Sequence, residues 1–150
     1  MPLLQPGILL KATEALDDTF FAGAIILITE YNADGATGFI INKPFDRNLN
    51  ELVEFRHSPP FPLHDGGPVD REHLFFIHRR PELIDGGKPV TGGWHSGGDF
   101  KKAITGINNK SITEQDTRIF IGYCGWDAGE LEAEVEEGSW IFIQDAAFKV

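Results

Sequence analysis

The sequence contains five histidines, which are candidate metal ligands because an imidazole nitrogen commonly binds zinc. Four of them share one stretch with two aspartates: His64, Asp65, Asp70, His73, His78 and His95. None forms an HExxH motif or a His/Cys pair at zinc spacing. Adjacent side chains on a strand point to opposite faces, which separates His64 from Asp65. The sequence therefore predicts surface or turn histidines and no metal site.

Cys124 and Ser96 are the candidate nucleophiles. Cys124 lies in a Gly-Tyr-Cys-Gly-Trp segment between a strand end and a helix start, a position that can lower a thiol pKa. The alternative is a small buried residue that fills a tight turn, and it is favoured because no histidine stands nearby in sequence. Ser96 fails the nucleophile-elbow pattern, since Trp94 stands where a glycine is required. Neither residue is predicted to be catalytic.

The glycine clusters do not match phosphate-binding loops. Gly86-Gly87-Lys88 lacks both the spacing and the hydroxyl residue of such a loop. Gly66 and Gly67 are typical of turns with positive φ, the alternative being a nest for a small anion. The sequence therefore predicts no cofactor.

The net charge of −10 results from 23 acidic and 13 basic residues. This surplus repels nucleic-acid phosphates and anionic lipid, and the basic doublets Arg79-Arg80 and Lys101-Lys102 are too dispersed to override it. Six of the acids lie in residues 127–137, which contain no basic residue. This run is either a solvated helix face or a docking surface for a basic partner.

The length of 150 residues suits a single domain, residues 1–150. No apolar run reaches the roughly 18 residues that span a bilayer, and the first residues lack the pattern of a signal peptide. A single cysteine cannot form an internal disulfide, so nothing calls for an oxidising compartment. We expect a cytoplasmic domain without a membrane segment.

The elements that must position these residues follow from hydrophobic periodicity. Strands are expected over residues 7–11, 24–31, 37–42, 63–65, 74–78, 118–123 and 140–143, with a continuation at 147–150. The runs at 24–31 and 37–42 are joined by Asp34-Gly35, which predicts a hairpin. Helices are expected over residues 48–55, with Asn48 as cap, 99–108 and 127–137, whereas residues 79–98 are expected to be loose. Without a strict βαβ rhythm, this indicates an α+β protein with a mixed sheet and about three short helices.

The helix at residues 127–137 has the most complete sequence signals. Asp127 as N-cap and Glu130 three residues later predict a capping box. Trp126 before the cap could pack on Leu131 as a hydrophobic staple, and Gly138 would end the helix.

Several segments together resemble the YqgE/AlgH family, bacterial proteins of unestablished biochemical function. The similar stretches are residues 6–10, 18–21, 32–44 (NADGATGFIINKP), 65–69 (DGGPV) and 122–134 (GYCGWDAGELEAE). The resemblance implies a cytoplasmic α+β domain whose strongly bent sheet forms a pseudo-barrel. Some members are labelled transcriptional regulators, and no catalytic residue or cofactor is established for the family. The family usually continues to a further helix, so the resemblance implies either a shortened chain or a short member.

The resemblance also supplies a recurring pattern of glycine, proline and polar residues. Structural roles in turns are expected for Gly35, Gly38, Pro44, Gly66, Gly67, Pro68, Gly125 and Gly129. The candidates for ligand binding or interaction are Asn32, Asn42, Tyr123, Trp126 and Glu132. The two asparagines flank the predicted hairpin, and their alternative role is to hydrogen-bond the turn backbone.

These observations favour a non-enzymatic regulatory or protein-interaction domain with an unknown protein partner, which would be basic if the acidic run at residues 127–137 is its docking surface. The alternative is a small enzyme or ligand-binding domain with a pocket near Tyr123, Trp126 and Glu132. That alternative requires the three side chains to converge on one cavity. A third hypothesis, direct DNA regulation, rests only on the family's label, and the net charge of −10 counts against it.

Overall fold

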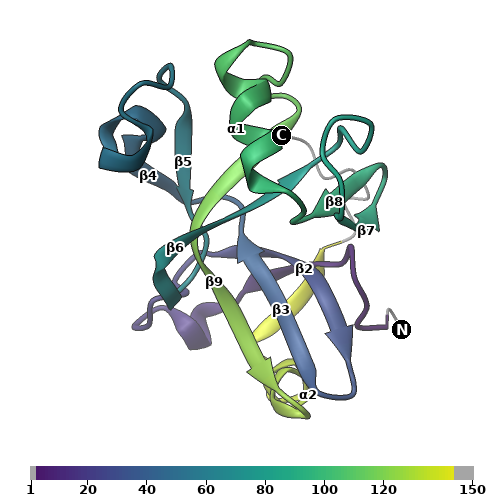
Figure 1. The fold of residues 1–150 in the computed structure, drawn as a ribbon. Helices are drawn as coiled ribbons and strands as arrows, with labels where there is room; N and C mark the ends of the chain where they lie inside the picture. The colour runs from purple at the N-terminus through teal and green to yellow at the C-terminus, as the bar shows by residue number, and fades with distance from the viewer. Residues whose placement is uncertain (1–2, 144–150) are drawn as a thin grey trace.

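The computed structural model describes residues 3–143, over which ten strands carry two α-helices and three short 3₁₀ turns (Figure 1). The strands are β1 (Leu9–Ala12), β2 (Ile25–Asn32), β3 (Gly35–Ile40), β4 (Pro44–Asn48), β5 (Pro62–Asp65), β6 (Val69–His78), β7 (Lys88–Thr91), β8 (Trp94–Ser96), β9 (Thr117–Asp127) and β10 (Trp140–Ile143). The helices are α1 (Phe100–Asn108) and α2 (Glu130–Glu136), and the turns are η1 (Glu14–Leu16), η2 (Leu49–Glu51) and η3 (Val53–Phe55). The continuation expected at 147–150 and any further helix lie outside the described residues.

The strands follow the order β10-β1-β2-β3-β9-β6-β8-β7, with β4 and β5 branching beside β9. All pairs are antiparallel except β5 with β9, so the sheet is mixed, and the predicted α+β class is confirmed. The pseudo-barrel is not confirmed. Among the described residues β10 pairs only with β1 and β7 only with β8, so the sheet stays open.

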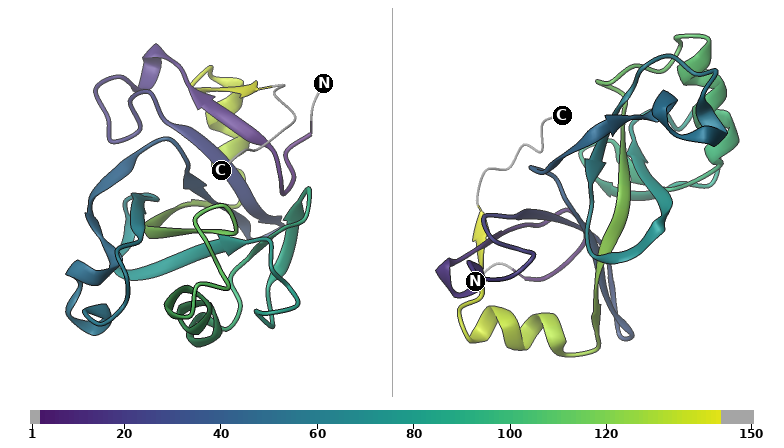
Figure 2. Two further views of the ribbon diagram at one scale, coloured as in Figure 1. Left: turned by 90° about the horizontal axis from the view of Figure 1, so that it is seen from above. Right: turned by 90° about the vertical axis from the view of Figure 1, so that its left-hand side faces the viewer.

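The long strand β9 joins two halves of the molecule, as the right-hand view of Figure 2 shows. Its C-terminal part pairs with β3, and its N-terminal part lies between β5 and β6. One buried cluster packs around α2 and includes Ile26, Ile40 and Leu131. A second packs under α1, and a third, rich in phenylalanine, lies between the two halves of the sheet. The packing around β9 therefore fixes how the halves meet.

Local sequence signals place the hairpin and α1 where they were predicted. The β2–β3 register passes from Ile26↔Ile40 to Asn32↔Gly35, with a bulge between Ile28 and Glu30. In α1 the Asp99 carboxylate accepts a hydrogen bond from the backbone N–H of Lys102, as expected of an N-cap. The helix buries one apolar stripe against β6 and β9, in agreement with its periodicity.

The helix predicted over residues 48–55 is wrong, which leaves two α-helices rather than three. Asn48 does begin a helical turn, and its backbone N–H donates to Glu51 Oε2 at 2.5 Å. Leu52 then adopts an extended conformation that separates η2 from η3. This break keeps Leu49 and Leu52 on the core while Val53 turns outward with 77% of its surface exposed. Tertiary burial outweighs local helix propensity here.

The start of α2 also differs from the prediction, because β9 continues through Trp126 and Asp127 to pair with β3. The N-cap is Gly129, with φ of 84°, rather than Asp127. Half of the expected capping box forms all the same, since the backbone N–H of Asp127 donates to Glu130 Oε1 at 2.6 Å. Residues 79–98 differ as well, since they contain the β7–β8 hairpin instead of a loose segment.

The chain crosses from one edge of β9 to the other at residues 66–68. The preceding strand β5 pairs with β9 on one edge, and the following strand β6 pairs with it on the other. At the crossing, a Cβ on Gly67 would overlap the backbone of Tyr123, and a Cβ on Gly122 would overlap the carbonyl of Gly67. Gly66 donates its N–H to the carbonyl of Ile121. Only glycines allow two backbones to approach this closely.

We predict that Gly67→Ala lowers the free energy of unfolding by more than about 3 kcal/mol, because it combines a φ of 154° with a backbone clash. The matched control is Gly129→Ala, which has a positive φ but no heavy atom within 4 Å of the added methyl group. The positive φ alone should lower the free energy of unfolding of this control variant by about 1–2 kcal/mol. Urea unfolding measures the free energy of unfolding of both variants. An equal decrease in the two would show that the backbones at the crossing are not in tight contact.

Candidate functional site

A hollow lies on one face of the sheet where the ends of β2, β3 and β9 meet. On the opposite face, Ala36 and Trp126 pack with Leu131 of α2. Because side chains alternate along a strand, Gly35 and Thr37 of β3 and Gly125 of β9 face away from α2. Gly35 and Gly125 carry no side chain, and this leaves a cavity of about 420 Å³.

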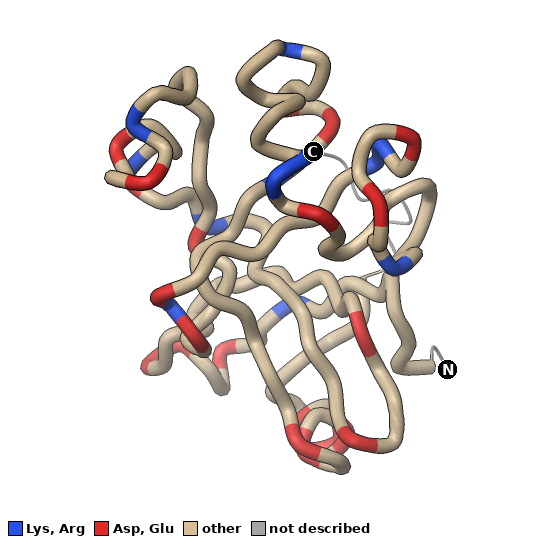
Figure 3. Tube along the Cα trace, in the orientation of Figure 1, with Lys and Arg blue, Asp and Glu red and all other residues tan. Residues whose placement is uncertain are grey.

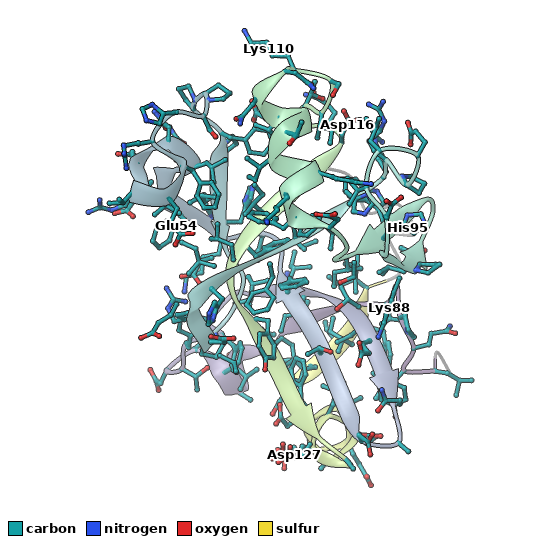
Figure 4. All side chains as sticks on the ribbon, in the orientation of Figure 1. Glu54, Lys88, His95, Lys110, Asp116 and Asp127 are labelled. Atoms are coloured by element: carbon teal, nitrogen blue, oxygen red, sulfur yellow. The ribbon has the colours of Figure 1, made fainter. Side chains whose placement is uncertain are left out.

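Three carboxylates line this hollow: Glu30 near the end of β2, Asp34 in the turn between β2 and β3, and Asp127 at the end of β9. Figure 4 shows Asp127 at the far end of β9 and Lys88 beside β2. The Lys88 ammonium lies 3.6 Å from Glu30 Oε2. Both side chains are exposed, so this ion pair contributes little stability. The remaining wall contains Val69 and Tyr123.

The two asparagine candidates hydrogen-bond the backbone. Asn32 Oδ1 accepts from the N–H of Asp34 at 2.8 Å, which closes the turn between β2 and β3. Asn42 Oδ1 accepts from the N–H of Ile25, and its Nδ2 donates to the carbonyl of Gly23, both at 2.9 Å. Asn42 thus holds the segment that leads into β2, away from the hollow, whereas Asn32 also lines it.

The acids of α2 bond to the chain's own side chains and backbone. Glu134 Oε1 accepts the indole N–H of Trp126 at 3.1 Å and that of Trp140 at 3.0 Å. Glu132 accepts the hydroxyl of Tyr31, and this hydrogen bond raises the pKa of Tyr31. Together with Glu130, three of the six acids in residues 127–137 therefore anchor the helix. Half of the acidic run is therefore engaged in holding the fold together.

The five sequence candidates consequently do not converge on one cavity. Asn32, Tyr123 and Trp126 line the hollow, but the indole of Trp126 bonds to Glu134 on the α2 side. Asn42 and Glu132 lie outside it. The sequence reasoning missed Glu30, Asp34, Asp127 and Thr37 as lining residues. Asp34 stood in the predicted turn, but assigning it to a hollow requires knowing which face α2 covers.

Three of the stretches that carry the family resemblance, residues 32–44, 65–69 and 122–134, meet at the crossing over β9, beside the buried carboxylate of Asp65. Asp65 accepts two hydrogen bonds from the Arg71 guanidinium, at 2.6 and 3.2 Å. Arg71 also donates to the carbonyl of Gly67 at 2.9 Å. Lys43 lies 3.9 Å from Asp65, and its ammonium sits 3.8 Å from the ring centroid of Phe20. This cluster fastens the crossing, because each charge has a partner within the chain.

The histidines occupy separate environments. His78 is fully buried in β6, contrary to the predicted surface or turn position, because its ring packs between Phe76 and His95. Burial lowers the pKa of His78, and burial followed by Arg118 lowers the pKa of His64 to about 4. Among residues 3–143, no group of three or more His, Cys, Asp or Glu side chains could hold a metal ion.

The Cys124 thiol is fully buried and donates to the carbonyl of Gly66 at 3.4 Å. Burial raises its pKa to about 12. This environment favours the space-filling role over an activated nucleophile.

Comparison with known proteins identifies the class of protein that carries this fold. A profile of the family described as AlgH-like matches residues 9–149. The UPF0301 protein CT0663 of Chlorobaculum tepidum is 41% identical over 145 residues, 97% of this chain and 77% of that protein. The UPF0301 protein BF2109 of Bacteroides fragilis is 33% identical over 93% of this chain and 71% of its own length. The chain belongs to the AlgH-like, or UPF0301, family.

Solved structures share the same fold. The AlgH protein of Pseudomonas aeruginosa superposes with a TM-score of 0.72 at 25% identity, covering 95% of this chain and 80% of that one. Protein DIP2367 of Corynebacterium diphtheriae gives a TM-score of 0.73 at 20% identity, covering 94% of this chain and 76% of that one. In the part of the chain that the structure describes, no helix is long and apolar enough to cross a membrane.

We predict that Glu134→Ala lowers the free energy of unfolding by about 2–4 kcal/mol, because it leaves two indole N–H groups without an acceptor. Glu134→Gln keeps an acceptor oxygen and should cost less. Glu136→Ala is the matched control, since Glu136 is exposed on the same helix. Thermal or urea unfolding distinguishes the three variants. A loss for Glu136→Ala as large as that for Glu134→Ala would contradict the bridging role.

We predict that Cys124 resists alkylation by iodoacetamide at pH 8 in the folded protein and reacts once the chain is unfolded in urea. Burial withholds the thiol from solvent, and the raised pKa makes the thiolate scarce. Mass spectrometry of the labelled chain measures this. Labelling of the folded protein as fast as that of a free thiol would instead indicate an activated cysteine.

Proposed function

We propose that this protein is a protein-interaction domain that binds a basic segment of a partner protein in the hollow formed by β2, β3 and β9. The observation that carries the proposal is the rim of three carboxylates around a cavity floored by glycines. Lysine or arginine side chains are long enough to enter such a cavity while keeping their charge near the carboxylates. The proposal takes the cytoplasm as the compartment, in keeping with the single cysteine.

The charge distribution supports a basic partner. Residues 25–42 and 121–143, which build this end of the molecule, contain no lysine or arginine. Figure 3 shows that the charged residues at the lower end of the molecule, around α2, are all acidic, whereas the basic residues lie higher in the view. Opposite charges a few ångströms apart attract by about 1–4 kcal/mol at a protein surface. The negative charge at this end of the molecule also repels the phosphates of nucleic acid, which disfavours direct DNA binding.

The alternative of an enzyme or ligand pocket near Tyr123, Trp126 and Glu132 has less support, because Tyr123 and Glu132 lie on opposite faces of the sheet. An interaction domain of this kind would regulate its partner by occupying a basic segment that the partner needs elsewhere. This regulatory role follows from the proposed binding and stands or falls with it.

We predict that the double variant Asp34→Asn with Asp127→Asn weakens binding of an alternating Lys-Ser peptide by about tenfold, because it removes two of the three carboxylates at the hollow. The matched control is Glu136→Gln with Glu137→Gln, which makes the same change in net charge on the exposed end of α2. Titration followed by ¹⁵N NMR measures affinity and locates the bound peptide.

Binding should also weaken as salt rises, because the attraction is between exposed charges. Equal losses in the two double variants would mean that net charge alone attracts the peptide and would overturn the proposed site. Absence of binding to the unmodified chain at low salt would have the same consequence.

A further inference from the structure

A second hollow opens on the same face of the sheet as the acid-rimmed hollow. It has a volume of about 280 Å³ and lies between β3, β6 and the start of α1. Its lining is mostly aromatic and aliphatic: Phe39, Leu74, Phe75, Phe76 and Phe100, with Ser96, Gly97 and Gly98 completing it. Leu74, Phe75 and Phe100 are half-buried, so their apolar surface can be reached from solvent.

The two hollows are linked along β3 and across β9. Thr37 lines the first hollow and Phe39 lines the second, and as alternate residues of β3 they face the same way. Same-face neighbours on a strand are about 7 Å apart. Beside them, Tyr123 of the first hollow contacts Phe75 of the second edge-on, with ring centroids 5.2 Å apart. The two cavities are thus adjacent parts of one surface.

We propose that the two hollows form one groove for an extended segment of the partner protein. In this segment a lysine or arginine enters the acid-rimmed hollow, and an aromatic or large aliphatic side chain two residues away enters the second hollow. The spacing follows from β3, because a strand-like segment laid along it presents every second side chain to the same face. This inference rests on the proposed function and adds the apolar anchor, its spacing and the extended conformation.

The chemistry of each hollow distinguishes the two anchors. The first is bounded by three carboxylates, and one of them, Glu30, pairs with an ammonium group of the chain itself, that of Lys88. The second has no charged side chain in its lining. An apolar side chain that leaves water for this second hollow gains free energy in proportion to the area it buries. A segment with only one of the anchors would leave the other hollow in contact with water.

The experiment uses the full chain labelled with ¹⁵N and four capped peptides of equal length. They contain Lys-Ser-Phe, Lys-Ser-Ala, Lys-Ser-Ser-Phe and Ser-Ser-Phe within the same Gly-Ser flanks. Their affinities are measured by titration, and the amide shifts of Thr37 and Gly97 report on the two hollows. We expect Lys-Ser-Phe to bind about tenfold more tightly than each of the other three.

The outcomes separate the two proposals. If Lys-Ser-Phe and Lys-Ser-Ala bind equally well at the acid-rimmed hollow, the apolar anchor is wrong while the proposed function stands. If Lys-Ser-Ser-Phe binds as tightly as Lys-Ser-Phe, the extended two-residue spacing is overturned, and a helical partner is favoured instead. If Ser-Ser-Phe binds as tightly as Lys-Ser-Phe, or no peptide binds, the basic partner of the proposed function also falls. Shifts at both Thr37 and Gly97 with Lys-Ser-Phe alone support the groove.

Discussion

The crossing of residues 66–68 over β9 is the constraint on which the rest of the structure depends. Both edges of β9 are used by the same continuous piece of chain, β5 on one side and β6 on the other. This arrangement is possible only if neither backbone carries a side chain at the contact between Gly67 and Gly122. Asp65 and Arg71 then fasten the crossing from both ends. With β9 held in this way, its last residues are free to pair with β3 and to project α2.

That pairing gives the β3–β9 ribbon two different faces. On the α2 face, Trp126 and Trp140 share the Glu134 carboxylate within a closed apolar cluster. On the other face the β3–β9 register places Gly35, Thr37 and Gly125. These small residues do not fill the space above the sheet, and a hollow remains there. The acidic character of the chain is divided accordingly. The acids of α2 mainly hold the helix in place, whereas those at the strand ends surround open space.

Elements whose signals are local could be predicted from the sequence, and those fixed by distant contacts could not. The β2–β3 hairpin follows from two apolar runs and Asp34-Gly35, and α1 follows from its hydrophobic period. By contrast, β9 extends to Asp127 only because β3 lies alongside, which places the N-cap of α2 at Gly129 rather than at Asp127. The β7–β8 hairpin is glycine-rich and polar, and it forms because β8 pairs with the end of β6.

The candidate site likewise combines features that the sequence predicts with features that only distant contacts determine. The family resemblance points to Asn32, Tyr123 and Trp126, and all three line the hollow, but a sequence motif contains no information on which face of the sheet each strand residue occupies. The aromatic walls next to it are rigid for a physical reason. Phe39 stacks on Phe120 with centroids 4.4 Å apart, and Phe75 is held between Phe39 and Tyr123. A groove whose walls are already packed loses little conformational entropy when a segment binds, so even a short anchor pair can be recognised there.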